Sequence, residues 1–279
     1  VGISDRRSKA YKDLTDKSYM SEIPWYEDLT PFQIPLRDFI YDCLDDKRIE
    51  FSETNYIYHK IDVDFDPEKE YQTPLWDEHI LKVFCTDSEG NYDPLKEDLL
   101  YEIIGFHLTP RYKIKTFFAI LGPKDVGKTF LSELLIGLIG SKHTTSIDLC
   151  KLGDNFGKET LPGKFLAVDS EPRGDDKGTS GYKNPSINGA ELKRITAGEE
   201  GNNVNIKFQR HGTQKLRAKP LLLANILPPI KDKSGVALER MIIFEVENKP
   251  KKLIYNLYQK IWQEREGIVN KAIKAFSRA

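Results

Sequence analysis

Gly122-Pro-Lys-Asp-Val-Gly-Lys-Thr129 is the stretch that decides the fold of this 279-residue chain. It matches the pattern G-x-x-x-x-G-K-[ST] completely, and it follows the short apolar run 115–121, which predicts a fully buried strand. An apolar stripe at helical spacing then predicts a helix over 128–139, closed by Gly140. A strand, a glycine loop and a helix in this order predict a loop that binds phosphate.

The chemistry of this loop follows from its backbone. Successive N–H groups and the positive end of the helix dipole can enclose a phosphate, and side chains at Gly122 and Gly127 would obstruct its approach. We expect Lys128 to reach the β- and γ-phosphates of a nucleotide, and the Thr129 hydroxyl to hold Mg²⁺. The predicted nucleotide-binding residues are Gly122, Pro123, Lys124, Asp125, Val126, Gly127, Lys128, Thr129 and Phe130.

Two carboxylates follow the next predicted strand, 164–168. Residues two apart in an extended chain point to the same side, so Asp169 and Glu171 can both face the nucleotide. We assign Asp169 to the magnesium shell and Glu171 to polarising the attacking water. Two acids solvated at the end of a strand are the alternative interpretation.

The composition is that of a globular protein, with 39% hydrophobic and 30% charged residues. No run approaches 18 apolar residues, so no membrane span is predicted. The three cysteines lack the spacing of a zinc site or a disulfide framework, which indicates a reducing compartment. The chain begins with Val1, and we expect it to be a fragment of a longer polypeptide.

Charge is unevenly distributed although the net charge is only −1. Residues 38–102 contain 19 acidic and 6 basic residues, and residues 249–279 contain 8 basic and 2 acidic residues. Both biases can be ordinary solvated faces. The predicted organisation is a mostly helical N-terminal domain at 1–106 with a polar arm at 1–20, a P-loop ATPase domain at 107–250, and a basic C-terminal helical segment at 251–279.

Shorter patterns complete the prediction of local structure. Helical spacing occurs at 36–44, 95–108 and 253–276, and strand-like alternation occurs at 51–66. Short apolar runs at 221–224 and 241–246 predict further strands of a sheet that is covered on both faces. The fold class predicted is therefore α/β, with a P-loop ATPase core.

Four motifs follow the acidic strand end in a distinctive order. They are Lys193–Glu199, a hairpin-like Asn203–Lys219, Pro220–Pro228 with Asn225, and Asp232–Arg240 followed by Met241–Phe244. This order resembles the helicase module of superfamily 3, in particular the phage, plasmid and poxvirus primase-helicase branch. Residues 58–67, Trp76 and residues 102–105 resemble the helical domain that precedes the ATPase in that branch. The resemblance covers about residues 50–250.

The resemblance implies an AAA+ type core that binds ATP and Mg²⁺ between the subunits of a ring, usually a hexamer. Asn225 matches the family's polar sensor, whose amide orients water against the γ-phosphate; a turn asparagine is the alternative. Arg240 matches the arginine that reaches the neighbouring subunit's nucleotide; a surface ion pair with Glu239 is the alternative. The branch often has a single acid, corresponding to Glu171, which leaves the role of Asp169 open.

Basic residues gather in the hairpin-like segment, with His211 and Gly212 at its predicted tip. These basic residues are Lys207, Arg210, Lys215, Arg217 and Lys219. In superfamily 3 a hairpin at this place projects into the central channel, which implies that Lys207, Arg210, His211 and Lys215 contact DNA phosphates without reading bases. A solvated hairpin is the alternative. The basic C-terminal helix we interpret as packing with a solvated face.

Our hypothesis is an ATP-driven DNA helicase that works on single-stranded and forked DNA as a homo-oligomer. The predicted catalytic residues are Lys128, Glu171, Asn225 and Arg240. The branch implies a fused or associated primase, and a location in the cytoplasm or wherever the plasmid or virus replicates. The alternative is an ATP-binding initiator or scaffold that assembles on DNA without unwinding it. A small-molecule P-loop kinase is a weaker rival, because it would not explain the hairpin or the Arg240 segment.

Overall fold

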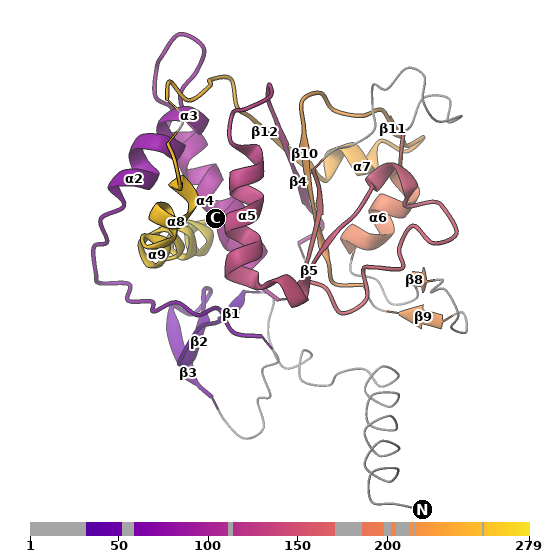
Figure 1. The fold of residues 1–279 in the computed structure, drawn as a ribbon. Helices are drawn as coiled ribbons and strands as arrows, with labels where there is room; N and C mark the ends of the chain where they lie inside the picture. Colours follow the sequence, from indigo (N-terminus) through magenta and orange to yellow (C-terminus); the bar gives the residue numbers. More distant parts are fainter. Residues whose placement is uncertain are drawn as a thin grey trace, which may run out of the picture.

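A five-stranded sheet forms the centre of the molecule, and all its neighbouring strands are parallel (Figure 1). The computed structural model describes residues 32–51, 59–110, 114–170, 186–197, 202–204, 212–214, 216–252 and 254–279. In spatial order the strands are β12 (Met241–Glu245), β4 (Phe117–Leu121), β10 (Lys219–Ala224), β6 (Leu166–Asp169) and β5 (Thr144–Ser146). The predicted α/β class is confirmed, and the sheet is that of a P-loop ATPase core.

Both faces of this sheet are covered, as the unbroken apolar sequence of β4 predicts. Phe118 belongs to the buried cluster that contains α5 (Lys128–Ile139), whereas Phe117 belongs to the cluster that contains α6 (Gly189–Ala197). Successive strand residues point to opposite faces, so one short apolar run supplies two cores. Figure 1 shows α5 on one side of the sheet and α6 on the other, with the short α7 (Val236–Glu239) on the side of α6.

A group of helices packs on the outer side of α5 and combines helices from the N-terminal and C-terminal parts of the chain. Its centre is the contact between α4 (Pro94–Leu108) and α9 (Arg265–Arg278), and the predicted helix over 95–108 is confirmed. The two helices touch at Gly105, where a Cβ would lie 2.6 Å from the Phe276 Cβ and 2.7 Å from the Ala272 carbonyl oxygen. The other members are α2 (Pro74–Trp76), η2 (Asp77–Leu81, π-helical), α3 (Lys82–Phe84) and α8 (Leu257–Trp262).

The single helix predicted over 253–276 is in fact two, because α8 ends at Trp262 and α9 begins at Arg265. Glu264 lies between them, and its carboxylate accepts hydrogen bonds from the backbone N–H groups of Leu75 at 3.0 Å and Trp76 at 2.9 Å. It thereby caps α2, a helix that lies far away in the sequence. Because α8 and α9 are separate helices, Glu264 lies at their junction, and its carboxylate reaches α2 from there.

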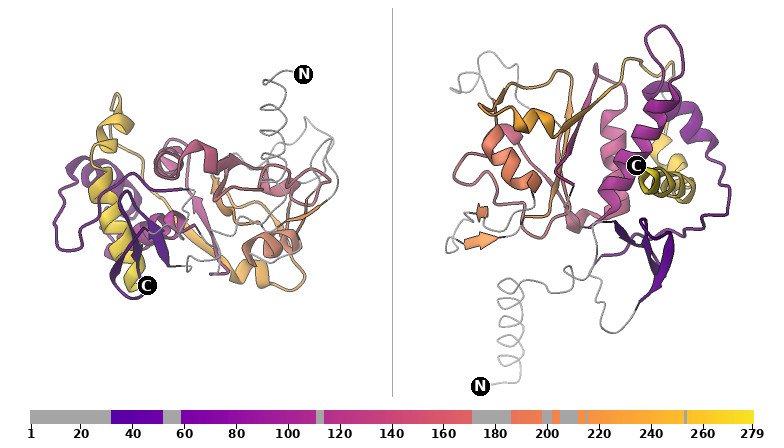
Figure 2. Two further views of the ribbon diagram at one scale, coloured as in Figure 1. Left: turned by 90° about the horizontal axis from the view of Figure 1, so that it is seen from below. Right: turned by 180° about the vertical axis from the view of Figure 1, so that it is seen from behind.

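The helix predicted over 36–44 is wrong. The chain there forms β2 (Phe39–Asp42), which pairs in antiparallel fashion with β1 (Gln33–Pro35) and β3 (Lys47–Glu50) in a small separate sheet (Figure 2). Ile40 is 1% exposed and its neighbour Tyr41 is 4% exposed, so β2 is covered on both faces. A strand buried on both faces loses its alternation, and its apolar run then cannot be distinguished from a buried helix.

The strand predicted over 51–66 is not found in its described part. Within residues 59–66 the only strand pairing among the described residues is a single parallel bridge between Leu36 and Ile61, and the Val63 N–H donates to the Ile61 carbonyl oxygen at 2.8 Å in a tight turn. The alternation reflects burial of Ile61, Val63 and Phe65 against the helical group. Burial of alternate residues therefore occurs here without a ladder of backbone hydrogen bonds.

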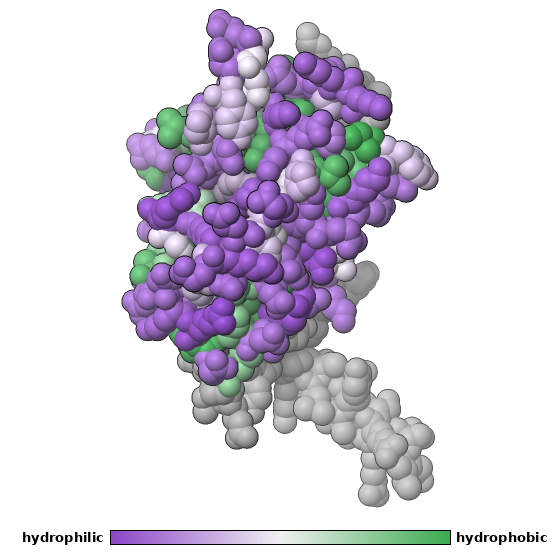
Figure 3. Space-filling model, turned by 90° about the vertical axis from the view of Figure 1, so that its left-hand side faces the viewer, coloured by the Kyte–Doolittle hydropathy of each residue, from purple (hydrophilic) through white to green (hydrophobic). Residues whose placement is uncertain are grey.

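Short elements complete the described structure. They are η3 (Ser141–His143), η4 (Leu149–Lys151), the parallel pair β7 (Ile187–Asn188) and β11 (Ile230–Lys231), and the antiparallel pair β8 (Asn202–Val204) and β9 (Gly212–Gln214). No helix among the described residues is both long and apolar enough to cross a membrane. The face formed by the helical group is mostly hydrophilic, with separate small apolar spots (Figure 3).

Candidate nucleotide site

The predicted phosphate loop joins β4 directly to α5. Residues 122–127 form the connection, and α5 begins at Lys128 immediately after Gly127, whose φ of +96° lies in the left-handed region that favours glycine. Gly122 lies against the chain that follows β12, and a Cβ at this position would be 2.4 Å from the Val246 carbonyl oxygen. The first glycine is therefore required by a close backbone contact, and the second by its own conformation.

The first turn of α5 presents backbone donors toward this loop. The first N–H groups of any helix lack intrahelical partners, and no side chain caps α5. Together with the helix dipole, such donors favour an anion. Thr129, in this turn, is exposed. A hydroxyl beside a phosphate site fits Mg²⁺, which usually takes one or two protein ligands together with substrate phosphates.

The amino group of Lys128 lies at the centre of the site. Its Nζ donates to the carbonyl oxygens of Gly122 at 2.6 Å and Pro123 at 2.7 Å, and to the side-chain oxygen of Asn225 at 3.1 Å. Asn225 directly follows β10, which pairs with β4, so both side chains stand at the carboxyl edge of the sheet. The structure thus brings together two of the predicted catalytic residues.

Burial lowers the pKa of the Lys128 amine, and the negative charge of Asp125 opposes this shift. A partly desolvated ammonium group is a stronger partner for phosphate than one in bulk water, because screening is weaker. Asp125 itself has a φ of +67°, an uncommon conformation for a residue other than glycine. The loop therefore concentrates positive charge from Lys128 and from its own N–H groups at one place.

The remaining predicted loop residues divide by exposure. Pro123, Lys124 and Asp125 are exposed, whereas Val126 is 2% exposed and belongs to the core. The ring of Phe130 contacts that of Tyr258, with centroids 5.9 Å apart. Val126 can therefore serve a nucleotide through its backbone only, whereas the Phe130 ring is partly buried against Tyr258.

Asp169 ends β6, but its carboxylate is almost completely buried, with the residue 2% exposed. One of its oxygens accepts a hydrogen bond from the Leu149 N–H at 2.8 Å. This bond ties the end of β6 to η4. The assignment of Asp169 to the magnesium shell stays a prediction, and Glu171 lies outside the described residues.

Arg240 lies far from the phosphate loop of its own chain. Its carbonyl oxygen accepts from the Phe117 N–H at the start of β4, whereas the loop begins after Leu121 at the other end. At about 3.3 Å per residue the two are roughly 16 Å apart along the sheet. The guanidinium donates instead to the Lys193 carbonyl oxygen at 2.8 Å and the Thr196 hydroxyl at 3.2 Å, both near the end of α6.

The hairpin predicted over 203–219 is confirmed in its two described strands, but Gly212, predicted at the tip, is the first residue of β9. In β8 and β9, Asn202 pairs with Gln214 and Val204 with Gly212 in an antiparallel register. The predicted DNA-binding residues Lys207, Arg210, His211 and Lys215 lie outside the described residues.

Lys219 does not belong to a basic hairpin surface, contrary to the sequence prediction. It is 0% exposed, and its Nζ donates to the carbonyl oxygens of Phe106 and Thr109, the latter at 2.6 Å, and to the Thr109 hydroxyl. Desolvation holds the pKa of this amine well below its usual value. Lys219 thus connects the start of β10 to the end of α4, and its place next to the buried run 220–224 was the signal available in the sequence.

These features define an α/β fold of the P-loop ATPase type with an attached helical group. No protein-family model and no curated protein sequence matches the chain. Two solved structures of the C-terminal region of NrS-1 resemble it, with TM-scores of 0.53 and 0.54 at 18% sequence identity. The likeness covers 75% of this chain and 47% of the NrS-1 chains, so the chain spans about half their length.

A further solved structure, of the JCV helicase, has a TM-score of 0.40 at 17% identity, covering 71% of this chain and 52% of that chain. This likeness is too remote to bear on function. The resemblance expected from the order of the motifs is thus confirmed as a likeness of fold.

Proposed function

We propose that this chain is the motor module of a superfamily 3 DNA helicase, which hydrolyses ATP and moves single-stranded DNA. One observation carries the proposal: the Lys128 amine lies 3.1 Å from the Asn225 amide oxygen, although the two residues are 97 apart in sequence. A cation and a polar sensor on one side of a phosphate loop are the arrangement that phosphoryl transfer needs. The likeness of fold to the NrS-1 C-terminal region supports it.

In this proposal each group has one task. The backbone N–H groups that follow Pro123 in the loop and the Lys128 ammonium bind and neutralise the phosphates of ATP, and the Asn225 amide orients the attacking water. Mg²⁺, bound beside Thr129, would supply charge neutralisation between the β- and γ-phosphates. Glu171 polarises the water. Positioning and electrostatics supply nearly all of the catalysis in this class of reaction.

A second copy of the chain completes the site. Arg240 cannot reach the loop of its own chain, but it stands at an edge of the sheet that another copy can approach. The edge strand β12 exposes apolar side chains there, with Ile242 37% and Ile243 40% exposed. An exposed apolar edge strand favours coverage by another chain. Stabilisation by such an arginine accelerates phosphoryl transfer by about 10³–10⁵ in other systems.

The contacts of Arg240 also suggest how hydrolysis moves DNA. Its guanidinium holds the carbonyl end of α6, and the chain runs from α6 through residues 198–201 into β8 of the hairpin. When Arg240 turns to a neighbour's γ-phosphate, it gives up these bonds. The end of α6 and the hairpin it leads to can then shift, which couples the state of one subunit's nucleotide to the hairpin of the next.

The basic hairpin residues Lys207, Arg210, His211 and Lys215 then grip phosphates of single-stranded DNA inside a ring, which we propose to be a hexamer. A grip on phosphates suits a motor that must travel over any sequence, and salt should weaken it. A primase fused to or associated with this module is part of the same proposal.

The test is ATP hydrolysis with and without an oligo-dT strand. We expect strong stimulation by DNA, its loss in Lys128→Ala, and unwinding of a forked duplex. Mixing Arg240→Ala copies with intact copies should lower turnover per intact copy, because each intact nucleotide site then meets neighbours without the arginine. Unchanged turnover per intact copy, with a protein that stays monomeric on DNA and ATP, would contradict the proposal.

The alternative, an ATP-binding initiator or scaffold, predicts a different result. Such a protein would bind DNA and ATP without turnover or strand displacement. The contact between Lys128 and Asn225 is the observation against it, because a scaffold needs no water-orienting amide beside its phosphate loop.

A further inference from the structure

A second pocket lies at the opposite end of α5 from the phosphate loop, with a volume of about 510 Å³. Its walls come from residues 59–63, from residues 137–143 at the end of α5, and from Trp262 and Arg265 at the junction of α8 and α9. The twelve residues of α5 separate it from the loop by about 18 Å. The pocket is therefore distinct from the nucleotide site, and its size lies within the range of ligand-binding pockets.

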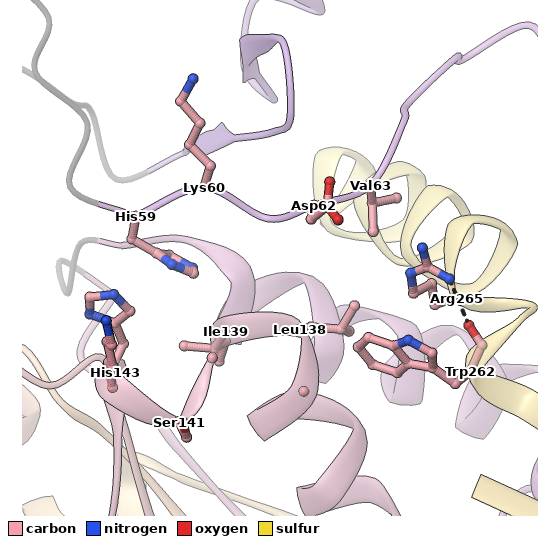
Figure 4. A pocket seen from close by; sticks show the side chains of 13 residues that line it. His59, Lys60, Asp62, Val63, Leu138, Ile139, Ser141, His143, Trp262 and Arg265 are labelled. Carbon is pink, nitrogen blue, oxygen red and sulfur yellow. Dashed lines mark hydrogen bonds between the residues drawn. The ribbon is translucent and has the colours of Figure 1, made fainter. Parts of the chain in front are cut away.

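Part of the inner surface of this pocket is apolar and aromatic. Val63, Leu138 and Ile139 line it together with the Trp262 indole. Figure 4 shows His59 and His143 at one end of the pocket, with Trp262 and Arg265 at the other. This part of the pocket suits a flat aromatic ligand, because apolar side chains and the indole ring can pack against it.

The rim of the pocket carries positive charge. Lys60, Lys142 and Arg265 line it, and Lys60 extends outward in Figure 4. Asp62 is the only carboxylate among the lining residues, and it accepts a hydrogen bond from the Arg37 guanidinium at 2.6 Å. With Asp62 engaged by Arg37, the three cations dominate the rim and favour an anion.

His59 provides an independent sign of a ligand. The residue is 7% exposed, and its Nε2 has no hydrogen-bond partner within the described parts of the chain. Burial lowers the pKa of His59 to about 4, so its ring is neutral at pH 7 and can donate or accept a hydrogen bond. A buried polar atom without a partner is costly unless a ligand or water satisfies it. No cluster of three or more metal-binding side chains occurs among the described residues, so His59 and the adjacent His143 do not indicate a metal site.

The pocket opens at the same edge of the sheet as the base of the hairpin. Thr144, directly after η3, pairs with Leu166, and Leu166 pairs with Lys219, which follows the hairpin. With strands about 4.8 Å apart, Thr144 and Lys219 are separated by roughly 10 Å. A polymer held at the hairpin can therefore continue to the pocket, whereas the phosphate loop lies at the other edge.

We propose that this pocket binds one nucleotide unit of single-stranded DNA, with the base against Trp262 and the apolar floor and the phosphates at the basic rim. The proposal rests on the proposed function, because it requires a chain that binds single-stranded DNA. It adds a contact outside the hairpin. The combination of an apolar aromatic floor and a cationic rim matches base and phosphate together, whereas an acidic peptide would use the rim alone.

Photo-crosslinking tests the position of the strand. The intact chain is irradiated with a dT20 oligonucleotide that carries 5-iodo-deoxyuridine at alternate positions, and the linked peptides are identified by mass spectrometry. We expect one crosslink at Trp262 or His59 in addition to any in the hairpin. Free dTMP at millimolar concentration serves as competitor, and a strand site predicts that it leaves the crosslink in place.

A matched pair of variants tests the charges. Lys142→Glu with Arg265→Gln alters the rim, and Lys274→Glu with Arg278→Gln makes the same change in charge on α9, outside the residues that line the pocket. We expect the rim variant to weaken dT20 binding about 5- to 20-fold and the control less than 2-fold. The slope of log affinity against log salt should also fall by about 0.7 for each phosphate that the rim no longer binds. Equal thermal unfolding temperatures establish that both variants are folded.

Three results would overturn the inference. Crosslinks found only elsewhere in a chain that binds dT20 would place the strand outside the pocket. Equal weakening in the rim and control variants would reduce the effect to overall charge. Displacement by dTMP or by poly-glutamate at low concentration would assign the pocket to a free nucleotide or to an acidic peptide. In all three cases, ATP hydrolysis that is still stimulated by DNA would leave the proposed function intact. If the unaltered chain shows no DNA-stimulated ATP hydrolysis, both the proposed function and this inference are contradicted.

Discussion

Replacing Gly122 by alanine should damage both the fold and the nucleotide site. A Cβ at this position would lie 2.4 Å from the Val246 carbonyl oxygen, and real Cβ contacts are essentially never under 3.0 Å. The loop and the chain after β12 must therefore separate by at least about 0.6 Å, the difference between these two distances. Forced overpacking of this kind typically costs about 1–3 kcal/mol of unfolding free energy.

The same shift moves the phosphate loop. Gly122 donates its N–H to the Ala224 carbonyl oxygen at 3.2 Å and accepts from the Lys128 amine at 2.6 Å, so displacement of Gly122 disturbs both. A misplacement of about 1 Å can reduce catalysis roughly 100-fold. We expect Gly122→Ala to lower the unfolding temperature by about 2–12 °C, from about 1–3 kcal/mol at about 2–4 °C per kcal/mol in a chain of this size, and to weaken MgATP binding.

Thermal unfolding with and without MgATP measures both effects in one assay, because a bound ligand raises the unfolding temperature. The control is Gly163→Ala, at a glycine with a φ of +72° and nothing within 4 Å of its Cβ position. That variant strains its own backbone but should keep its full response to MgATP. A Gly122→Ala protein with unchanged stability and an unchanged response to MgATP would refute the reasoning.

Two further predictions concern the helical group. Gly105→Ala should lower the unfolding free energy by about 1–2 kcal/mol, because the new Cβ would lie 2.7 Å from the Ala272 carbonyl oxygen. This loss is expected although alanine favours helices by about 1 kcal/mol over glycine. A gain in stability, measured by urea unfolding, would contradict the contact. Burial lowers the pKa of His107 from 6.5 to about 3, so the unfolded chain takes up a proton at this side chain first as the pH falls. The unfolding free energy is therefore at its full value above about pH 6.5 and decreases between pH 6.5 and 3. At pH 4.5 the decrease is about 2–3 kcal/mol. His107→Gln should reduce this loss, as urea unfolding at pH 7 and pH 4.5 would measure, and an equal loss in both proteins would show that His107 does not contribute.

The fold of the core could be predicted because its signals are local. The strand at 117–121, the loop at 122–127 and the helix at 128–139 follow one another directly, so spacing and glycine positions describe them fully. The order of motifs alone singled out Asn225 as a candidate residue. Its contact with Lys128 then follows from parallel strands, whose carboxyl ends meet at one edge of the sheet.

Prediction failed where burial was complete. The residues of β2 have helical spacing by chance, and a strand covered on both faces has no polar side to reveal its period. The sequence pattern predicts a surface cation at Lys219 because lysine is usually exposed, but three oxygens from the end of α4 surround its amine. Those oxygens lie 110 or more residues earlier in the chain, beyond the reach of any local pattern.

The order of residues along the chain was sufficient to predict a glycine loop between a buried strand and a helix, because a turn of that kind requires particular residues at fixed spacing. The positions of Arg240 at the far end of the sheet from its own loop, and of His59, Lys142 and Trp262 around one pocket, became visible in the folded chain alone. These relations join segments far apart in the chain, and they depend on how helices and strands pack. Packing is set by the whole buried surface, which no short run of residues encodes.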